Sequence, residues 1–214
     1  NWVEVFTSSD GGASWQLAVS TDPQQQKPDR LPLGGLKTGI GALDAKTAWV
    51  TGFDYGDQIW LYRTPDAGKT WQRQAVTAPA GYHTEGGAVE TRPPVFFGQD
   101  GFLPVLFHQE GQPTIFYVTH DDGATWRPTA PVKSAGNSSF VWSFIDSRHG
   151  FATDGKKIYA TEDGARSWTA ITMNRELTNV SQLAFVSTKA GWALADGTLW
   201  ATQDGGRTWT MLTH

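Results

Sequence analysis

Short runs of alternating apolar and polar residues follow one another along the whole chain, and turn-forming residues separate them. The last repeat reads VSQLAFVS, GWALA, TLWAT and TWTMLT between residues 180 and 213. Four short runs of this kind predict four β-strands joined by tight turns. No segment keeps a helical period for long, so the pattern predicts an all-β protein with almost no helix.

An eight-residue phrase, which we call the box, occurs five times in the 214 residues. It reads Ser/Thr-x-Asp-x-Gly-x-Ser/Thr-Trp. The aspartate and the tryptophan occur in every copy, as Asp10 and Trp15, Asp66 and Trp71, Asp121 and Trp126, Asp163 and Trp168, and Asp204 and Trp209. Successive aspartates are 56, 55, 42 and 41 residues apart. Periods of this size are typical of repeat proteins in which each repeat is one supersecondary unit.

A second signature precedes the later boxes, namely a small residue followed by an aromatic one. The pairs are Ala48-Trp49, Gly101-Phe102, Gly150-Phe151 and Gly191-Trp192. Together the two signatures predict four complete four-stranded units and an N-terminal half-unit that contains only the last two strands. We place the repeats at about 1–20, 38–77, 94–131, 139–173 and 180–214, within a single domain spanning residues 1–214.

The residue types of the box indicate a structural turn. The aspartate is expected to accept hydrogen bonds from backbone N–H groups about two residues on, and the glycine to supply a positive φ. The Ser/Thr hydroxyls can satisfy the remaining groups, while the tryptophan opens the next strand and covers the neighbouring core. Box four departs from the pattern, because Ala165 stands where the other boxes have glycine. We therefore expect some strain in that turn.

The five phrases resemble the Asp box, or BNR repeat, of sialidases, sortilin-type receptors, xyloglucan-hydrolysing glycosidases and the photosystem II stability/assembly factor family. The resemblance covers essentially the whole chain. It implies a β-propeller in which each box is the turn between the third and fourth strands of a blade. The segment GWALADGTLWATQDGGRTW is most similar to the assembly-factor-like group. Because the first blade lacks two strands, we expect the chain to be part of a larger or trimmed propeller.

Composition excludes several classes of protein. The net charge is −4 and Lys and Arg form no run, which argues against nucleic-acid binding. No apolar stretch approaches the roughly 18 residues of a membrane helix. There is no cysteine, so disulfides and Cys-ligated zinc are excluded. The five histidines show no metal-ligand spacing, and we predict neither a metal nor a cofactor.

Extra residues fall in two kinds of connection in the second and third blades. They lie around 21–37 and 78–94, between blades, and around 53–58 and 107–113, between second and third strands. In an up-and-down blade these connections share the face opposite the boxes, where a rigid scaffold can present binding loops. The candidate ligand-binding residues there are Arg30, Asp54, Tyr55, Asp57, Tyr82, His83, Glu85, Arg92, His108 and Glu110.

No catalytic residues are assigned. The segment Asp29-Arg30-Leu31-Pro32 loosely resembles the sialidase Arg-Ile-Pro motif, but Arg30 follows the first box, whereas the family motif precedes it. Loop carboxylates such as Asp57, Glu85 and Glu90 could form a glycosidase pair only at a defined separation. From the resemblance we expect a non-catalytic, exported binding or assembly protein, monomeric and extracytoplasmic, whose ligand is a protein or a glycan. The alternative is a sialidase-like or other glycoside hydrolase, or a remnant of one.

Overall fold

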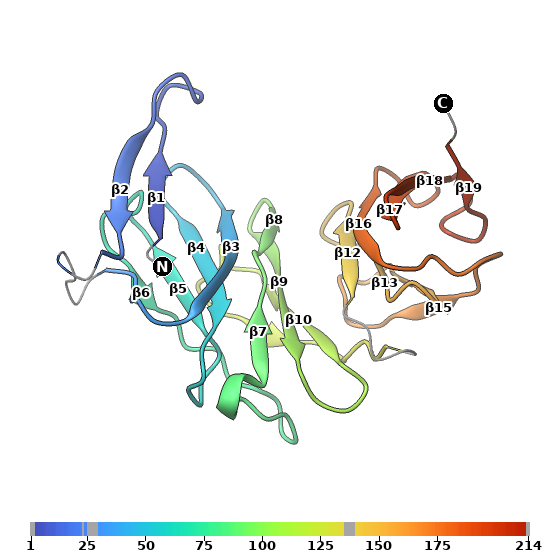
Figure 1. Ribbon diagram of the computed structural model, residues 1–214, viewed down its shortest axis with the longest axis horizontal. Coiled ribbons are helices and arrows are strands. Elements are labelled where there is room, and N and C mark those ends of the chain that lie inside the picture. Colours follow the sequence, from blue (N-terminus) through green and yellow to red (C-terminus); the bar gives the residue numbers. More distant parts are fainter. Residues whose placement is uncertain (1–2, 23, 25–29, 135–139, 213–214) are drawn as a thin grey trace. The chain divides into compact units, whose positions relative to one another are not determined.

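The computed structural model describes residues 3–22, 24, 30–134 and 140–212 (Figure 1). The chain forms two compact units. Unit 1 comprises residues 1–108 and 119–126, and unit 2 comprises residues 109–118 and 127–214. The connection predicted at 21–37 lies partly outside the described residues, as does the start of the repeat placed at 139–173.

Unit 1 begins with a two-stranded sheet of β1 (Glu4–Thr7) and β2 (Gln16–Ser20), which we call the half-blade. Blade 2 is the antiparallel sheet of β3 (Leu36–Ala42), β4 (Ala48–Phe53), β5 (Leu61–Thr64) and β6 (Gln72–Arg73). A 3-10 helix, η2 (Glu85–Gly87), leads to β7 (Val89–Thr91), β8 (Val95–Phe97) and β9 (Asp100–Phe107).

Blade 3 contains five strands, β7 to β11, because its first strand is split. The sequence Arg92-Pro93-Pro94 separates β7 from β8, since proline offers no N–H to continue a ladder. Both pieces pair antiparallel with β9. The remaining strands, β10 (Thr114–Thr119) and β11 (Arg127–Pro128), pair with each other and lie largely in unit 2.

Unit 2 also holds two four-stranded antiparallel blades. Blade 4 consists of β12 (Val141–Phe144), β13 (Gly150–Thr153), β14 (Ile158–Thr161) and β15 (Thr169–Ile171). Blade 5 consists of β16 (Val180–Phe185), β17 (Gly191–Ala195), β18 (Thr198–Thr202) and β19 (Thr210–Met211). The described residues contain no α-helix. The predicted all-β propeller-type fold, with four blades and an N-terminal half-blade, is confirmed.

Every box forms the same hydrogen-bonded turn. In the fifth box, Asp204 Oδ1 accepts the Thr208 N–H at 2.8 Å and Oδ2 accepts the Thr208 hydroxyl at 2.6 Å. The Thr202 hydroxyl donates to Asp204 and accepts the Gly206 N–H. The box aspartate therefore accepts from the residue four positions later, so the predicted separation of about two residues is wrong.

Two successive residues of each box have positive φ, which explains the glycines. Three non-glycine residues nevertheless occupy this region, namely Ala67, Asp122 and Ala165, with φ of 60°, 57° and 65°. The expected departure in the fourth box is thus real, since Ala165 adopts a conformation that glycine would take without cost.

The box turns of blades 2 to 5 are also tied to the turn between the first two strands of their own blade. The residue after each box aspartate donates its N–H to a carbonyl there. These pairs are Ala67 to Lys46, Asp122 to Gln99, Gly164 to Arg148 and Gly205 to Lys189, at 2.8–3.2 Å. Boxes and first turns therefore share one end of each blade, and the connections with extra residues emerge at the other end.

The box tryptophans pack to different extents. Trp71 and Trp209 are buried, at 1% and 2% exposure, within separate apolar clusters of units 1 and 2. Trp126 and Trp168 are half-buried. Trp15 is 63% exposed, so the prediction that every box tryptophan is core is wrong there. The reason is that a box tryptophan packs against the preceding blade, and the described residues place none before the half-blade.

Candidate functional site

Two of the predicted loops meet in unit 1. The Thr84 hydroxyl donates to the Asp57 carbonyl at 2.6 Å, and a methyl group added at Gly87 would lie 3.3 Å from the Tyr55 ring. The Tyr82 ring lies 4.7 Å from that of Phe107. Figure 1 shows η2 at the end of unit 1 opposite the turn that joins β1 to β2, which is the first box. The structure thus gathers residues 54–58 and 82–87 at the end away from the boxes.

A groove opens beside these loops because the ladder between β5 and β6 stops early. Its last bond runs from the Gln74 N–H to the Leu61 carbonyl at 2.9 Å. The next carbonyl that faces β6 has another partner. The Ile59 carbonyl accepts Arg73 Nη2 at 3.3 Å. Residues 75–78 therefore separate from residues 57–59.

The resulting pocket has a volume of about 430 Å³. Its lining combines backbone with the side chains of Asp57, Gln58, Arg73, Thr77 and Thr84. Both charge signs are present, since Arg73 and Asp57 both line the pocket. We call this pocket the rim groove. In blade 3 the corresponding gap is closed, because Thr114 and Val132 exchange two backbone hydrogen bonds of 2.9 Å.

A charged cluster lies on β7 and β9 of the same unit. The Glu90 side chain is 10% exposed, with Arg92 Nε 2.6 Å from one carboxylate oxygen and His108 Nε2 3.4 Å from the other. The Arg92 contact is an ion pair without the alignment of a good hydrogen bond. The Glu90 carboxylate thus pairs with Arg92 and lies beside His108, which makes it part of the scaffold.

The remaining candidates are placed as follows. Arg30 contacts the Ala18 carbonyl at 3.5 Å, beside the half-blade, and Glu110 belongs to unit 2. Asp54 accepts the Gly56 N–H in a local turn. His83 lies 3.5 Å from Glu85, and the backbone N–H groups of Glu85 and Thr84 hold the pKa of the Glu85 carboxyl below its usual range. Within unit 1, the structure does not bring Arg30 together with the residues around η2.

Sequence reasoning missed Arg73, Gln58 and Thr84. Arg73 lies two residues after a box tryptophan, in a strand that the pattern assigns to structure alone. Thr84 stands between the predicted His83 and Glu85. At the groove, Arg73 reaches the Ile59 carbonyl across 14 residues, which leaves no local signal in the sequence.

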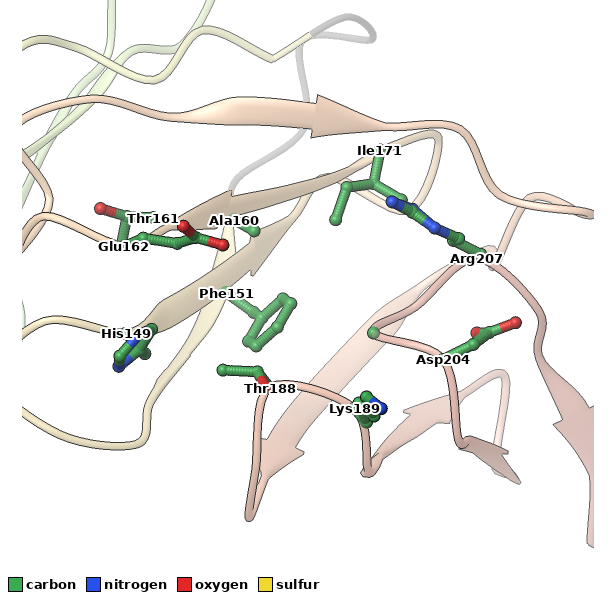
Figure 2. Close-up of a pocket in the computed structure, with 11 residues that line it drawn as sticks. His149, Phe151, Ala160, Thr161, Glu162, Ile171, Thr188, Lys189, Asp204 and Arg207 are labelled. Atoms are coloured by element: carbon green, nitrogen blue, oxygen red, sulfur yellow. The ribbon is translucent and has the colours of Figure 1, made fainter.

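A second pocket, of about 280 Å³, lies in unit 2 between blades 4 and 5 at the box end. Figure 2 shows the Phe151 ring between two walls, one with His149 and Glu162 and the other with Lys189 and Asp204. Two of these groups serve local turns. His149 Nδ1 lies 2.9 Å from the Asp146 carboxylate, and Asp204 holds the fifth box. This pocket therefore lies at the box end, whereas the rim groove lies beside the extended loops.

The chemistry available in the rim groove is hydrogen bonding and charge pairing. Among the described residues, no three His, Asp or Glu side chains are grouped so as to hold a metal ion. No helix of the described part is long and apolar enough to cross a membrane.

Comparisons with known proteins agree with this fold. Residues 114–214, slightly less than half of the chain, match the family model described as Sortilin-Vps10 (sortilin, neurotensin receptor 3). The structure of YCF48 bound to D1 peptide matches with a TM-score of 0.51 and 14% identity, covering 87% of this chain and 85% of that one. An ancestral GH74 enzyme matches with a TM-score of 0.55 and 13% identity over 88% of this chain. This chain covers 25% of that enzyme. The comparison with curated proteins found no match.

At these identities the structural matches establish the shared fold. The resemblance to propellers of the assembly-factor and glycosidase groups is thereby confirmed at the level of architecture. The same blades occur in YCF48, which was captured with a peptide, and in a GH74 enzyme, so the fold alone does not decide between binding and catalysis.

Proposed function

We propose that the chain is a non-catalytic binding module that takes an extended peptide segment of a partner protein into the rim groove. The observation that carries this proposal is the early end of the β5–β6 ladder. It leaves two strand continuations facing each other across about 430 Å³, where blade 3 has backbone pairing. An inserted strand can take up backbone hydrogen bonds in such a gap, with side-chain groups at its walls giving specificity.

The charges in the groove suggest what the peptide carries. Arg73 can pair with an acidic side chain, whereas Asp57 can accept from a basic or amide one. Tyr55, 81% exposed beside Gly87, offers an aromatic face two residues before Asp57 of the groove. The peptide-bound state of YCF48 supports a peptide as ligand for this fold. An extracytoplasmic location and a monomeric state belong to the same proposal.

The test is selection of short random peptides displayed on phage against the immobilised protein, followed by affinity measurement on the selected peptides. Arg73→Ala should weaken binding about tenfold to a hundredfold, because a charge-assisted contact is lost. Arg166→Ala, at an exposed arginine of the fourth box, is the matched control and should leave affinity unchanged. Selected peptides that bind both variants equally would contradict the proposal.

The glycoside hydrolase alternative is tested on the same preparations. Release of reducing sugar from xyloglucan, or turnover of a fluorogenic sialoside, that disappears in Glu85→Gln would replace the binding proposal with an enzymatic one. Absence of turnover together with Arg73-dependent peptide binding would favour the binding module.

A further inference from the structure

The pocket between blades 4 and 5, which we call the inter-blade pocket, has walls of opposite charge. Its volume is about 280 Å³, and all of its lining residues belong to unit 2. Blade 4 contributes the carboxylate of Glu162, whereas blade 5 contributes the cationic groups of Lys189 and Arg207. Figure 2 shows the side chains of Glu162 and Arg207 extending toward one another from opposite sides of the Phe151 ring.

These three charged side chains are not used by the fold. Among the described residues, no hydrogen bond or ion pair engages the carboxylate of Glu162, the ammonium of Lys189 or the guanidinium of Arg207. The two walls are therefore too far apart to neutralise each other directly. A ligand that carries one group of each sign can pair with both walls at once.

The other two ionisable groups of the lining are already engaged. Asp204 accepts the N–H and the hydroxyl of Thr208 within the fifth box, and Figure 2 shows its carboxylate directed away from the Phe151 ring. His149 is held through Nδ1 by the Asp146 carboxylate at 2.9 Å. The pocket thus keeps one carboxylate and two cationic groups for a ligand.

Hydrogen bonds fix the backbone from which the two cationic side chains extend. The Asn174 N–H, in the connection that leaves blade 4, donates to the Arg207 carbonyl at 2.8 Å. The Asn174 side-chain oxygen accepts the Trp209 N–H at 3.0 Å. The Lys189 carbonyl accepts the Gly205 N–H at 2.9 Å. The cationic wall is therefore anchored before a ligand arrives, which lowers the cost of ordering it on binding.

An apolar floor separates the charged walls. The Phe151 ring is 4% exposed and stacks on the Phe185 ring at 3.7 Å, while Ile171 and Ala160 complete the apolar lining. An apolar cavity of about 150 Å³ is already large enough to bind benzene. The inter-blade pocket therefore has room for a phenyl ring together with two charged groups.

The small–aromatic signature supports this floor. Phe185 pairs across the sheet with Gly191, where a methyl group would lie 2.7 Å from the Phe185 ring, closer than atoms can approach. The same pairing recurs in two other blades, as Phe96 with Gly101 and Phe144 with Gly150. The small residue of the signature therefore accommodates a phenylalanine ring, and in blade 5 that ring holds Phe151 in place.

We propose that the inter-blade pocket binds a free α-amino acid with an apolar side chain. Arg207 and Lys189 pair with the carboxylate of the ligand, and Glu162 pairs with its ammonium group. The apolar side chain of the ligand lies on the Phe151 floor. A peptide bond in place of either charged group would remove one of these pairs, so the free amino acid is preferred to a residue within a chain. The site is separate from the rim groove and does not depend on it.

The first test compares L-phenylalanine with two analogues that each lack one charge. Phenylpropanoate has no ammonium group, and phenethylamine has no carboxylate. In an NMR titration, L-phenylalanine should bind saturably and each analogue about tenfold to a hundredfold more weakly, because one charge-assisted contact is lost. Equal affinity for the three ligands, tightest binding of phenylpropanoate, or no saturable binding of L-phenylalanine would overturn the proposal.

Two variants assign the contacts to the two walls. Arg207→Gln/Lys189→Gln should abolish the preference for L-phenylalanine over phenethylamine, because both partners of the ligand carboxylate are lost. Glu162→Gln should abolish the preference over phenylpropanoate. Arg166→Gln, at the same position of the fourth box but outside the pocket lining, is the matched control and should bind like the wild type. A preference that persists in either folded variant would contradict the assignment.

Further measurements keep every outcome decisive. Arg207→Lys serves if the double variant is unstable, and should weaken binding of L-phenylalanine about tenfold because the bidentate geometry is lost. Acetyl-phenylalanine amide, which has neither charge, should not bind. If it binds as tightly as the free amino acid, the ligand is a protein segment and the proposal is wrong. Arg73→Ala in the rim groove should leave binding of L-phenylalanine unchanged, so failure of this site is distinguishable from failure of the proposed function.

Discussion

The half-blade region and the interface of blades 4 and 5 are built from the same repeat but differ in how the box tryptophan is packed. In the latter, Phe185 fills the space beside Trp209, which is 2% exposed. In the former, Ala42 leaves a pocket, and Trp15 of the half-blade is 63% exposed. The box turns of both regions nevertheless form the same hydrogen bonds. The turn is therefore a local structure, whereas the role of its tryptophan depends on what packs against it.

The largest expected difference between the two regions concerns the box tryptophans themselves. Trp209→Ala removes a buried ring from the core of unit 2 and should lower the free energy of unfolding by about 3–5 kcal/mol. Trp15→Ala removes an exposed ring and should cost less than about 1 kcal/mol. Urea unfolding of the two variants measures both. Equal losses would show that Trp15 is buried in solution and would remove the comparison.

The next largest effect on stability concerns the glycine that faces a phenylalanine ring across the sheet. Gly191→Ala places a methyl group against Phe185 and should cost about 1–3 kcal/mol through overpacking. The backbone of Gly191 is not in the left-handed region, so the effect is steric. Ala48→Gly in blade 2 has no ring to relieve and should cost only about 0.5–1 kcal/mol, from chain entropy. Thermal unfolding of each variant checks this, and a harmless Gly191→Ala would refute the stated reason for the small–aromatic signature.

The contrast between these regions also explains what the sequence could predict. Strand positions and box turns were predictable because they depend on residues within eight positions of one another, as Asp204 with Thr202 and Thr208 shows. The exposure of Trp15 was not, since it depends on which segment packs against the ring in space. The small residues Ala48 and Gly191 could be aligned from the sequence, whereas the packing of their partners Ala42 and Phe185 needed the structure.

The rim groove was predicted only in part. Extra length around 53–58 and 78–94 indicated loops on a shared end, and the Thr84–Asp57 hydrogen bond joins them. The early end of the β5–β6 ladder could not be predicted from the sequence, because the Ile59 carbonyl finds its side-chain partner Arg73 only in the folded blade. Loop length can therefore indicate where a site lies, while its shape depends on long-range contacts.

A smaller effect tests whether the turn is independent of packing. Asp204→Ala removes the acceptor of the Thr208 N–H and hydroxyl and should cost about 1–2 kcal/mol. Asp204→Asn keeps one acceptor oxygen and should lose less. Asp10→Ala in the half-blade breaks the same bonds to Ser14 and should lower the melting temperature in the same direction. An unchanged melting temperature in Asp10→Ala would mean that the turn contributes to stability only where its tryptophan is packed.

The smallest effect, and the most direct test of a local turn, is the titration of two box aspartates. The Ser14 hydroxyl and N–H and the Ser8 hydroxyl lower the pKa of Asp10 to about 2. In the third box, the Thr119 hydroxyl followed by the Thr125 N–H and hydroxyl lowers the pKa of Asp121 to about 2. Trp126 of that box is half-buried, whereas Trp15 is exposed. If the turn alone sets the pKa, both carboxyls should titrate together.

The sign of the pH dependence follows from these depressed values. Each carboxylate stabilises the fold fully above the unfolded pKa of about 3.9, and this contribution is lost as the pH falls toward 2. Carbon-detected NMR titration of the two carboxyl groups should give matching midpoints near 2, with the melting temperature falling over the same interval. An Asp10 midpoint close to 3.8 beside a depressed Asp121 would show that the exposed half-blade does not hold its turn in solution. The box turn would then form only when the blade is packed, instead of forming locally before packing.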